Sequence, residues 1–124
     1  MAGYRSHDLP NAFAAMDASV FLAQGSEGSC RAVMEAMACG RPVVGIGKGV
    51  VPEIIVDDSM GFLVPEGDAS LLADRLNVLL SDRACARERG RAARRRMEQT
   101  FRLLDKAEQT IQFYHALNRL KTND

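Results

Sequence analysis

The sequence lacks the features that mark membrane-spanning and exported proteins. Its 124 residues contain no apolar run near the roughly 20 residues that a membrane-spanning helix needs. Polar residues follow Met1 closely, where a signal peptide would carry an apolar segment. We therefore expect a soluble, cytoplasmic protein, with the inner face of the membrane left open as a further location.

The sequence also contains few cysteines and carries no net charge. The three cysteines, Cys30, Cys39 and Cys85, have no CxxC spacing, so the sequence predicts neither a zinc site nor a disulfide framework. They are expected to be small core or lining residues. The formal net charge is zero, which gives no overall electrostatic basis for binding nucleic acid. No metal and no nucleic-acid partner are expected.

The most informative stretch present is residues 25–44, which predicts a loop, a helix and a strand. Ser29 is a good helix N-cap. Gly40 is typical of the position just past a helix end, and Pro42 prevents the helix from continuing. The apolar residues 43–46 then predict a buried strand. At 124 residues the chain is at most one domain.

The remaining pattern alternates strands with helices. Apolar runs at 18–22 and 61–64 predict two more strands, and residues 1–4 resemble the end of another. Helical segments are expected at 9–16, 52–56, 69–80, 82–100 and 103–120. This alternation predicts an α/β fold with a parallel sheet, in which ligands bind beyond the carboxyl ends of the strands.

Glycines and leucines add detail to this prediction. Gly45, Gly47 and Gly49 predict a flexible loop whose backbone can approach a ligand. Gly90 interrupts an otherwise helical, arginine-rich segment. The apolar stripe expected along the 69–80 helix consists of Leu71, Leu72, Leu76, Leu79 and Leu80.

Two glutamates, Glu27 and Glu35, mark the central stretch. A carboxylate accepts two hydrogen bonds at once and therefore suits the vicinal diols of a nucleotide sugar. The helix N-terminus that follows the first loop offers free amides and a positive dipole end to a diphosphate. The spacing of the two glutamates is also compatible with an alternative, in which they cap a helix or are simply solvated and bind no ligand.

The same stretch resembles the signature of retaining glycosyltransferases of the GT-B fold, the large family that includes glycogen and sucrose synthases. The family pattern is Glu, seven residues, Glu-Ala-Met-Ala, one residue, Gly, one residue and Pro-Val-Val. It is matched here by Glu27, Glu35, Ala36, Met37, Ala38, Gly40, Pro42, Val43 and Val44. Downstream, later family blocks are matched by Gly49, Pro52, Glu53, Gly61, Leu63, Val64 and Asp68. The resemblance covers about residues 2–80.

The resemblance implies a fold and a division of the chain. The fold would be a partial Rossmann-like parallel sheet with flanking helices, corresponding to the second half of a GT-B C-terminal domain. Residues 1–80 would form the nucleotide-sugar-binding α/β region. Residues 81–124 would form C-terminal helices that pack on the same domain.

The resemblance also implies roles for individual residues. Glu27, the catalytic candidate, would contact hydroxyls of the donor sugar, and Glu35 would hold the ribose hydroxyls. The amides of Gly28, Ser29 and Cys30 would approach the sugar and the diphosphate. The family often has Phe-Gly where Ser29 and Cys30 stand. A hexose would be transferred with retention by same-face displacement, without a metal or cofactor, while the protein positions substrates and stabilises charge.

The family's acceptor-binding domain and its diphosphate-binding Arg and Lys have no counterpart in this sequence. We therefore expect a donor-binding region that is incomplete alone, whose partners are a nucleotide-diphosphate sugar and either the missing half or a second copy. An edge strand left by the absent strands would favour such association. The alternative is a non-catalytic interaction module that keeps the fold. A nucleotide-sugar epimerase of similar fold fits the 36–44 block less well.

Two minor features remain open from the sequence. The arginine-rich helix, which includes Arg83, Arg87 and Arg91, predicts a solvated face, with an anionic membrane surface or nucleic acid as alternatives. His7 beside Asp8 could form a catalytic dyad or lie in a surface loop. His115, in the last helix, is expected to pack against other residues.

Overall fold

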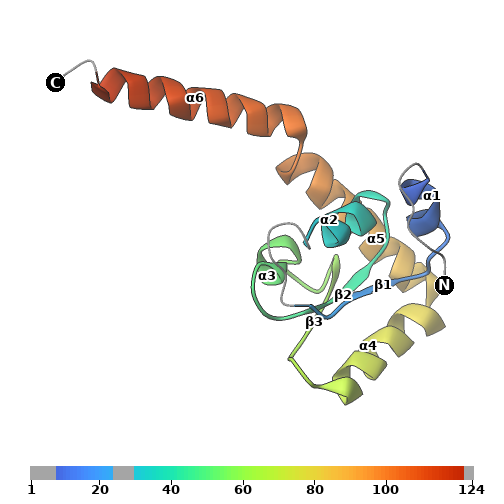
Figure 1. The fold of residues 1–124 in the computed structure, drawn as a ribbon. Coiled ribbons are helices and arrows are strands. Elements are labelled where there is room, and N and C mark those ends of the chain that lie inside the picture. Colours follow the sequence, from blue (N-terminus) through green and yellow to red (C-terminus); the bar gives the residue numbers. More distant parts are fainter. Residues whose placement is uncertain (1–7, 24–29, 122–124) are drawn as a thin grey trace.

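The structure is a computed structural model that describes residues 8–23 and 30–121. The expected strand end at residues 1–4 and the histidine of the His7–Asp8 pair lie outside these ranges. The described elements, in chain order, are α1 (Leu9–Ala14), β1 (Ser19–Phe21), α2 (Arg31–Ala38), β2 (Val43–Ile46), α3 (Val51–Ile54), β3 (Gly61–Val64), α4 (Ala69–Ser81), α5 (Arg83–Thr100) and α6 (Leu103–Lys121) (Figure 1).

The three strands form one parallel sheet in the order β1-β2-β3. Val44 of the central strand is paired with Val20 on one side and with Phe62 on the other. Every residue of β2 is buried, as expected for a central strand of a parallel sheet that is covered on both faces. The predicted α/β fold with a parallel sheet and flanking helices is confirmed.

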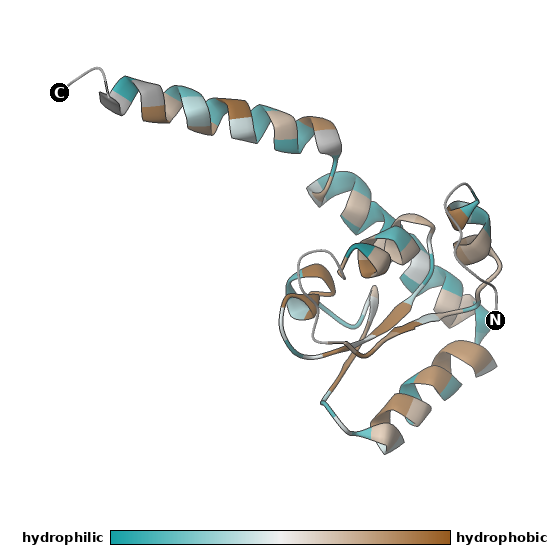
Figure 2. Cartoon of the chain, viewed as in Figure 1, coloured by the Kyte–Doolittle hydropathy of each residue, from teal (hydrophilic) through white to brown (hydrophobic). Residues whose placement is uncertain are grey.

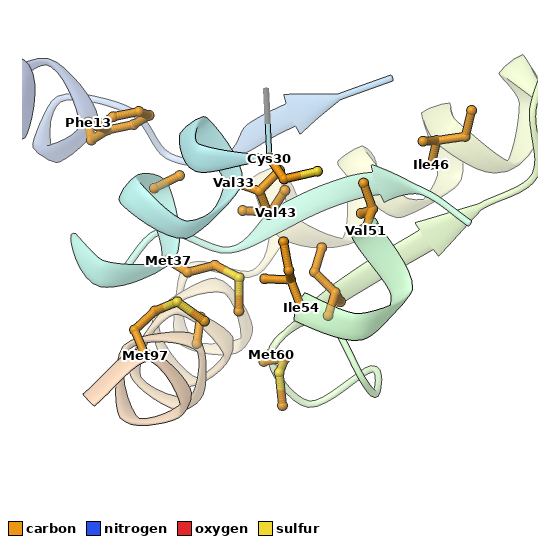
Figure 3. Close-up of a cluster of buried hydrophobic side chains, with 13 residues drawn as sticks. Phe13, Cys30, Val33, Met37, Val43, Ile46, Val51, Ile54, Met60 and Met97 are labelled. Carbon is orange, nitrogen blue, oxygen red and sulfur yellow. The ribbon is translucent and has the colours of Figure 1, made fainter. Parts of the chain in front are cut away.

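Helices cover the two faces of the sheet unequally. Val43 belongs to a large core that α1, α2, α3 and the second half of α5 build on one face (Figure 3). Val44 points to a smaller core on the other face, shared with Phe62, Val64, Leu79 and Ala86. Figure 2 shows brown, apolar strands between these layers. The alternation of neighbouring residues to opposite faces is the ordinary two-residue period of a strand.

The turn from α2 into β2 contains Gly40 and Pro42, the residues predicted to end the helix. Gly40 has a φ of +70°, a left-handed conformation that glycine adopts without a steric penalty. Its amide donates to the Met37 carbonyl, and the Arg41 amide donates to the Ala36 carbonyl. These two bonds form the paired arrangement of a Schellman motif and satisfy carbonyls at the helix end.

Two details of the sequence prediction are wrong. Gly45 lies inside β2 and not in the flexible loop, and a Cβ there would approach Val51 Cγ1 to 2.7 Å. The loop is therefore restricted to residues 47–50. Leu80 does not belong to the buried stripe of α4, since 58% of its surface is exposed, whereas Leu79 is buried.

Gly90 turns out to be the site of a helix-to-turn contact. A Cβ built on Gly90 would lie 2.0 Å from the carbonyl oxygen of Gly40. Only a glycine therefore lets α5 approach the α2–β2 turn this closely. The helix predicted over this segment is confirmed, and the glycine that is unfavourable in its middle is required by packing between residues fifty positions apart.

The last helix differs from the others because α6 extends away from the sheet (Figure 1). Its apolar side chains Leu104, Ile111, Phe113 and Tyr114 are exposed, and so is His115. The expectation that His115 packs against other residues is therefore wrong, since its side chain is exposed. α5 contacts α2 and α4, whereas packing of α6 on the same domain stays a prediction. Across the described residues, no helix combines the length and apolarity required to cross a membrane.

Candidate functional site

The candidate site lies at the carboxyl edge of the sheet. The segment after β1 leads into the start of α2 at this edge, and the segment after β2 leads into α3. Glu27, Gly28 and Ser29 fall in residues 24–29, outside the described part of the chain. Their placement at the site stays a prediction, and Cys30 and Glu35 are the predicted site residues that the structure describes.

Cys30 anchors the beginning of α2 in the core. It occupies the N-cap position, its exposure is 2%, and it packs in the same cluster as Val33 and Met37. The helix itself begins at Arg31, close to the start predicted at Ser29. Because its thiol is buried, Cys30 is suited to fixing the helix, and only its backbone can face the loop.

Glu35 lies on the outer side of α2, and its side chain is 31% exposed. Its neighbours Ala36 and Met37 are completely buried, so the helix holds the carboxylate in one position at the surface. Oε1 accepts a hydrogen bond from Nε of Arg31 at 2.9 Å. This pair one helical turn apart is largely solvated and contributes little stability, so it orients the carboxylate more than it stabilises the fold.

A hollow of about 490 Å³ lies beside Glu35. We call it the α2–α5 hollow, and its lining residues are Met34, Glu35, Ala38, Arg94, Met97, Glu98 and Phe101. Arg94 Nε donates to Glu98 Oε1 at 2.9 Å, and this hydrogen bond raises the pKa of Arg94 above its usual value. The hollow thus combines an apolar floor with two carboxylates that can accept hydrogen bonds from hydroxyl groups.

The glycine-containing loop after β2 is tied to the neighbouring strand and loop. The Gly47 amide donates to the Val64 carbonyl at 2.8 Å, and Lys48 Nζ lies 2.7 Å from Glu66 Oε2. Gly49 adopts a φ of +65°. No sequence pattern predicted the Lys48–Glu66 pair, because the two residues are eighteen positions apart and belong to different loops.

The structure brings together only part of the predicted site. Glu35 lines the α2–α5 hollow, whereas Gly47 and Lys48 do not. Arg94, Glu98 and Phe101 complete the hollow, although sequence reasoning placed no site residue on this helix. Within residues 8–23 and 30–121, no group of three or more potential ligands is arranged to hold a metal ion.

Comparison with known proteins gives a consistent set of similarities. The family model described as glycosyl transferases group 1 matches residues 1–96. Among curated proteins, alpha-maltose-1-phosphate synthase of Mycolicibacterium smegmatis is 36% identical over 91 residues, covering 68% of this chain and 24% of that protein. Spore coat protein SA of Bacillus subtilis is 30% identical over 108 residues, covering 86% of this chain and 29% of that protein.

Solved structures show the same similarity. Sucrose-phosphate synthase from Thermosynechococcus elongatus superposes with a TM-score of 0.70 at 30% identity, over 82% of this chain and 26% of that one. The C-terminal domain of a glycosyl transferase group 1 family protein, LpcC, from Francisella tularensis gives 0.67 at 28% identity, over 83% of this chain and 51% of that one. The chain thus spans about a quarter or less of the length of several curated relatives that it matches.

Proposed function

The chain belongs to the family of glycosyl transferases group 1, and from this premise we propose that it is the later part of a nucleotide-sugar-binding region. It would hold a nucleotide-diphosphate sugar while a hexose is transferred to an acceptor with retention. One similar structure is a sucrose-phosphate synthase, and another is the C-terminal domain of a glycosyl transferase group 1 family protein. Because the chain spans only a fraction of these proteins, the complete transfer reaction would need further protein.

The placement of Glu35 carries this proposal. The carboxylate is presented on a helix whose opposite side is completely buried, so its position is fixed before a ligand arrives. Preorganised groups recognise a ligand without an additional ordering cost. Oε1 accepts from Arg31, and Oε2 can accept from a ribose hydroxyl in the same plane.

The other donor contacts remain part of the proposal. Glu27 would bind hydroxyls of the sugar, and the amides of Gly28, Ser29 and Cys30 would face the diphosphate. The start of α2 would add its positive dipole end to these amides. The protein would then act by holding donor and acceptor in the reacting geometry and by stabilising the leaving diphosphate.

Thermal unfolding of the full chain with UDP-, GDP- and ADP-glucose tests donor binding. A ligand that binds only the folded state raises the melting temperature, and the rise grows with the logarithm of its concentration once this exceeds the Kd. We expect one nucleotide sugar to give a rise that Glu35→Gln abolishes. Glu88→Gln, an exposed glutamate on α5 outside the hollow, is the matched control and should keep the rise. Equal responses of the two variants would contradict the role of Glu35.

We also propose that the outer edge of β1 is covered in the working protein by the missing half or by a second copy. Among the described strands, β1 pairs with β2 alone, and Val20 of β1 and Leu22 just after it are 44% and 49% exposed. An edge strand with apolar side chains is a template for further pairing. Sedimentation velocity should show self-association that Val20→Lys weakens, and a monodisperse monomer at all concentrations would argue against self-association.

The alternative function is a non-catalytic interaction module. The exposed apolar residues of β1 and α6 favour it, since they would serve assembly whether or not a donor binds. The melting temperature in the presence of a donor distinguishes the two functions. A donor-dependent rise in melting temperature supports the donor-binding region, whereas association without any donor response supports the module.

A further inference from the structure

A second pocket lies at the opposite edge of the sheet from the candidate donor site. It is enclosed by the residues that precede β1 and β2, by the end of α4 and by the first half of α5. We call it the arginine pocket, and its polar lining consists of Asp17, Arg41, Arg83, Arg87 and Arg91. Its volume of about 340 Å³ is within the usual range for small-molecule sites, about 300–1,000 Å³.

The shape of this pocket depends on the glycine contact described above. Gly40 lines the pocket, and Gly90 packs against its carbonyl group. Arg87 and Arg91 flank Gly90 on α5, so the close approach brings their side chains beside Arg41 of the α2–β2 turn. The arginines therefore converge because of long-range packing, and not because of their spacing along one helix alone.

The charge of the pocket is strongly positive. Of the residues that the structure describes, four arginines and one carboxylate, that of Asp17, line it. Among the residues that the structure describes, no carboxylate lies within ion-pairing distance of Arg83, Arg87 or Arg91. Like charges one helical turn apart repel one another, so an anion bound between them would relieve this repulsion.

Arg41 adds a more buried donor group. Its Nη1 donates to the Met16 carbonyl at 3.0 Å, which fixes the guanidinium plane. Its Nε is buried and has no hydrogen-bond partner within the described ranges. Nε of Arg75, Arg89 and Arg96 is likewise buried without a partner, so what Arg41 contributes to the pocket is the positive charge of its positioned guanidinium group.

Other arginines of α5 differ from those of the pocket because they interact with side chains of the protein itself. Arg94 pairs with Glu98, and Arg89 donates to the Cys85 sulfur and stacks on Phe62. These side chains are used by the protein's own structure. Arg83, Arg87 and Arg91 instead line a concave space, and none of them forms an ion pair with a described carboxylate.

We propose that the arginine pocket binds a phosphate-bearing small molecule at a site separate from the donor site. Guanidinium groups form paired hydrogen bonds with phosphate oxygens. β2, which has four residues, separates the two edges of the sheet by about 10 Å at roughly 3.3 Å per residue. The phosphate ligand and the nucleotide sugar could therefore be bound at the same time.

Calorimetric titration of the full chain with inorganic phosphate and with pyrophosphate tests the proposal, using sodium chloride of equal ionic strength as the blank. We expect saturable binding that the Arg87→Gln, Arg91→Gln double variant weakens about tenfold or more. Arg95→Gln is the matched control, since Arg95 is exposed on the same helix and does not line the pocket. It should leave the affinity within about twofold.

A second arm distinguishes a free phosphate from a lipid headgroup. Vesicles of phosphatidylcholine containing phosphatidic acid are compared with pure phosphatidylcholine vesicles. Binding to the former alone, lost in the double variant, would support the pocket with a lipid phosphate as its source. No binding in either arm, or equal losses in Arg95→Gln and the double variant, would overturn the proposal. It would also be overturned if Glu35→Gln abolished phosphate binding, because the anion would then occupy the donor site.

Discussion

The contact between Gly90 and Gly40 predicts that Gly90→Ala destabilises the protein. In an exposed helix this substitution normally adds about 1 kcal/mol of stability, because alanine has the higher helix propensity. Here the added Cβ would lie 2.0 Å from the Gly40 oxygen and 2.9 Å from its carbonyl carbon. Both atoms are backbone, and Gly40 is held in a left-handed turn, so neither can move away cheaply.

The magnitude follows from these two opposing effects. An ordinary contact of a Cβ begins near 3.4 Å, so α5 would have to move by more than an ångström from the turn. Overpacking a core of this kind costs about 1–3 kcal/mol and occasionally more, and a backbone-to-backbone overlap belongs at the upper end. After the gain in helix propensity, we expect a net loss of about 2 kcal/mol in the free energy of unfolding.

Urea unfolding followed by circular dichroism measures this loss, and thermal melts should show a fall of several degrees. The propensity effect can be measured separately in the same helix. Glu88 is exposed on α5. The difference in the free energy of unfolding between Glu88→Ala and Glu88→Gly therefore measures the helix-propensity advantage of alanine over glycine without a packing change. Gly90→Ala should then be less stable than wild type, while Glu88→Ala is more stable than Glu88→Gly.

The reasoning is refuted if Gly90→Ala is as stable as wild type or more stable. Such a result would mean that α5 lies farther from the α2–β2 turn than described. It would also weaken the account of the arginine pocket, because the same contact places Arg87 and Arg91 beside Arg41.

Two further predictions concern single aspartates. Asp82→Ala should lower the free energy of unfolding by about 1 kcal/mol, because its Oδ1 caps α5 by accepting from the amides of Ala84 and Cys85 at 2.9 and 3.0 Å. An unchanged urea midpoint would contradict this. Asp57→Asn should remove a small pH dependence of the protein's stability. This dependence arises because hydrogen bonds from the side chain and amide of Ser59 hold the pKa of Asp57 below its usual 3.8. The stabilisation is present above pH 3.8 and is lost as the pH falls through the lowered pKa. The difference in melting temperature between wild type and variant should therefore shrink below pH 3.8, and a constant difference would contradict it.

Much of the fold could be predicted from the sequence because its signals are local. Asp68 caps α4 through a hydrogen bond from the Leu71 amide, as its position just before a periodic apolar segment suggested. Gly40 and Pro42 set the end of α2 and the start of β2 within a few residues. Caps, turns and alternating apolar residues depend on neighbours in the chain, so they can be recognised without knowing the tertiary structure.

The candidate site could be predicted only in part. The position of Glu35 on a helix at the carboxyl edge followed from the motif. Its surroundings did not, because Arg94, Glu98 and Phe101 come from a segment about sixty residues later. Sequence periodicity says which face of α5 is apolar, but not which helix that face will meet.

The order of helices and strands and the parallel sheet could be predicted from apolar periodicity, caps and turn residues, which involve residues close together in the chain. The family could be predicted from the motif that runs from Glu27 to Val44. The tertiary structure alone decided that Gly45 lies inside a strand, that Gly90 is required for a contact with Gly40, and that some arginines of α5 are paired while others line a pocket. The physical reason is that close packing brings together atoms from distant segments, and no local pattern encodes those meetings.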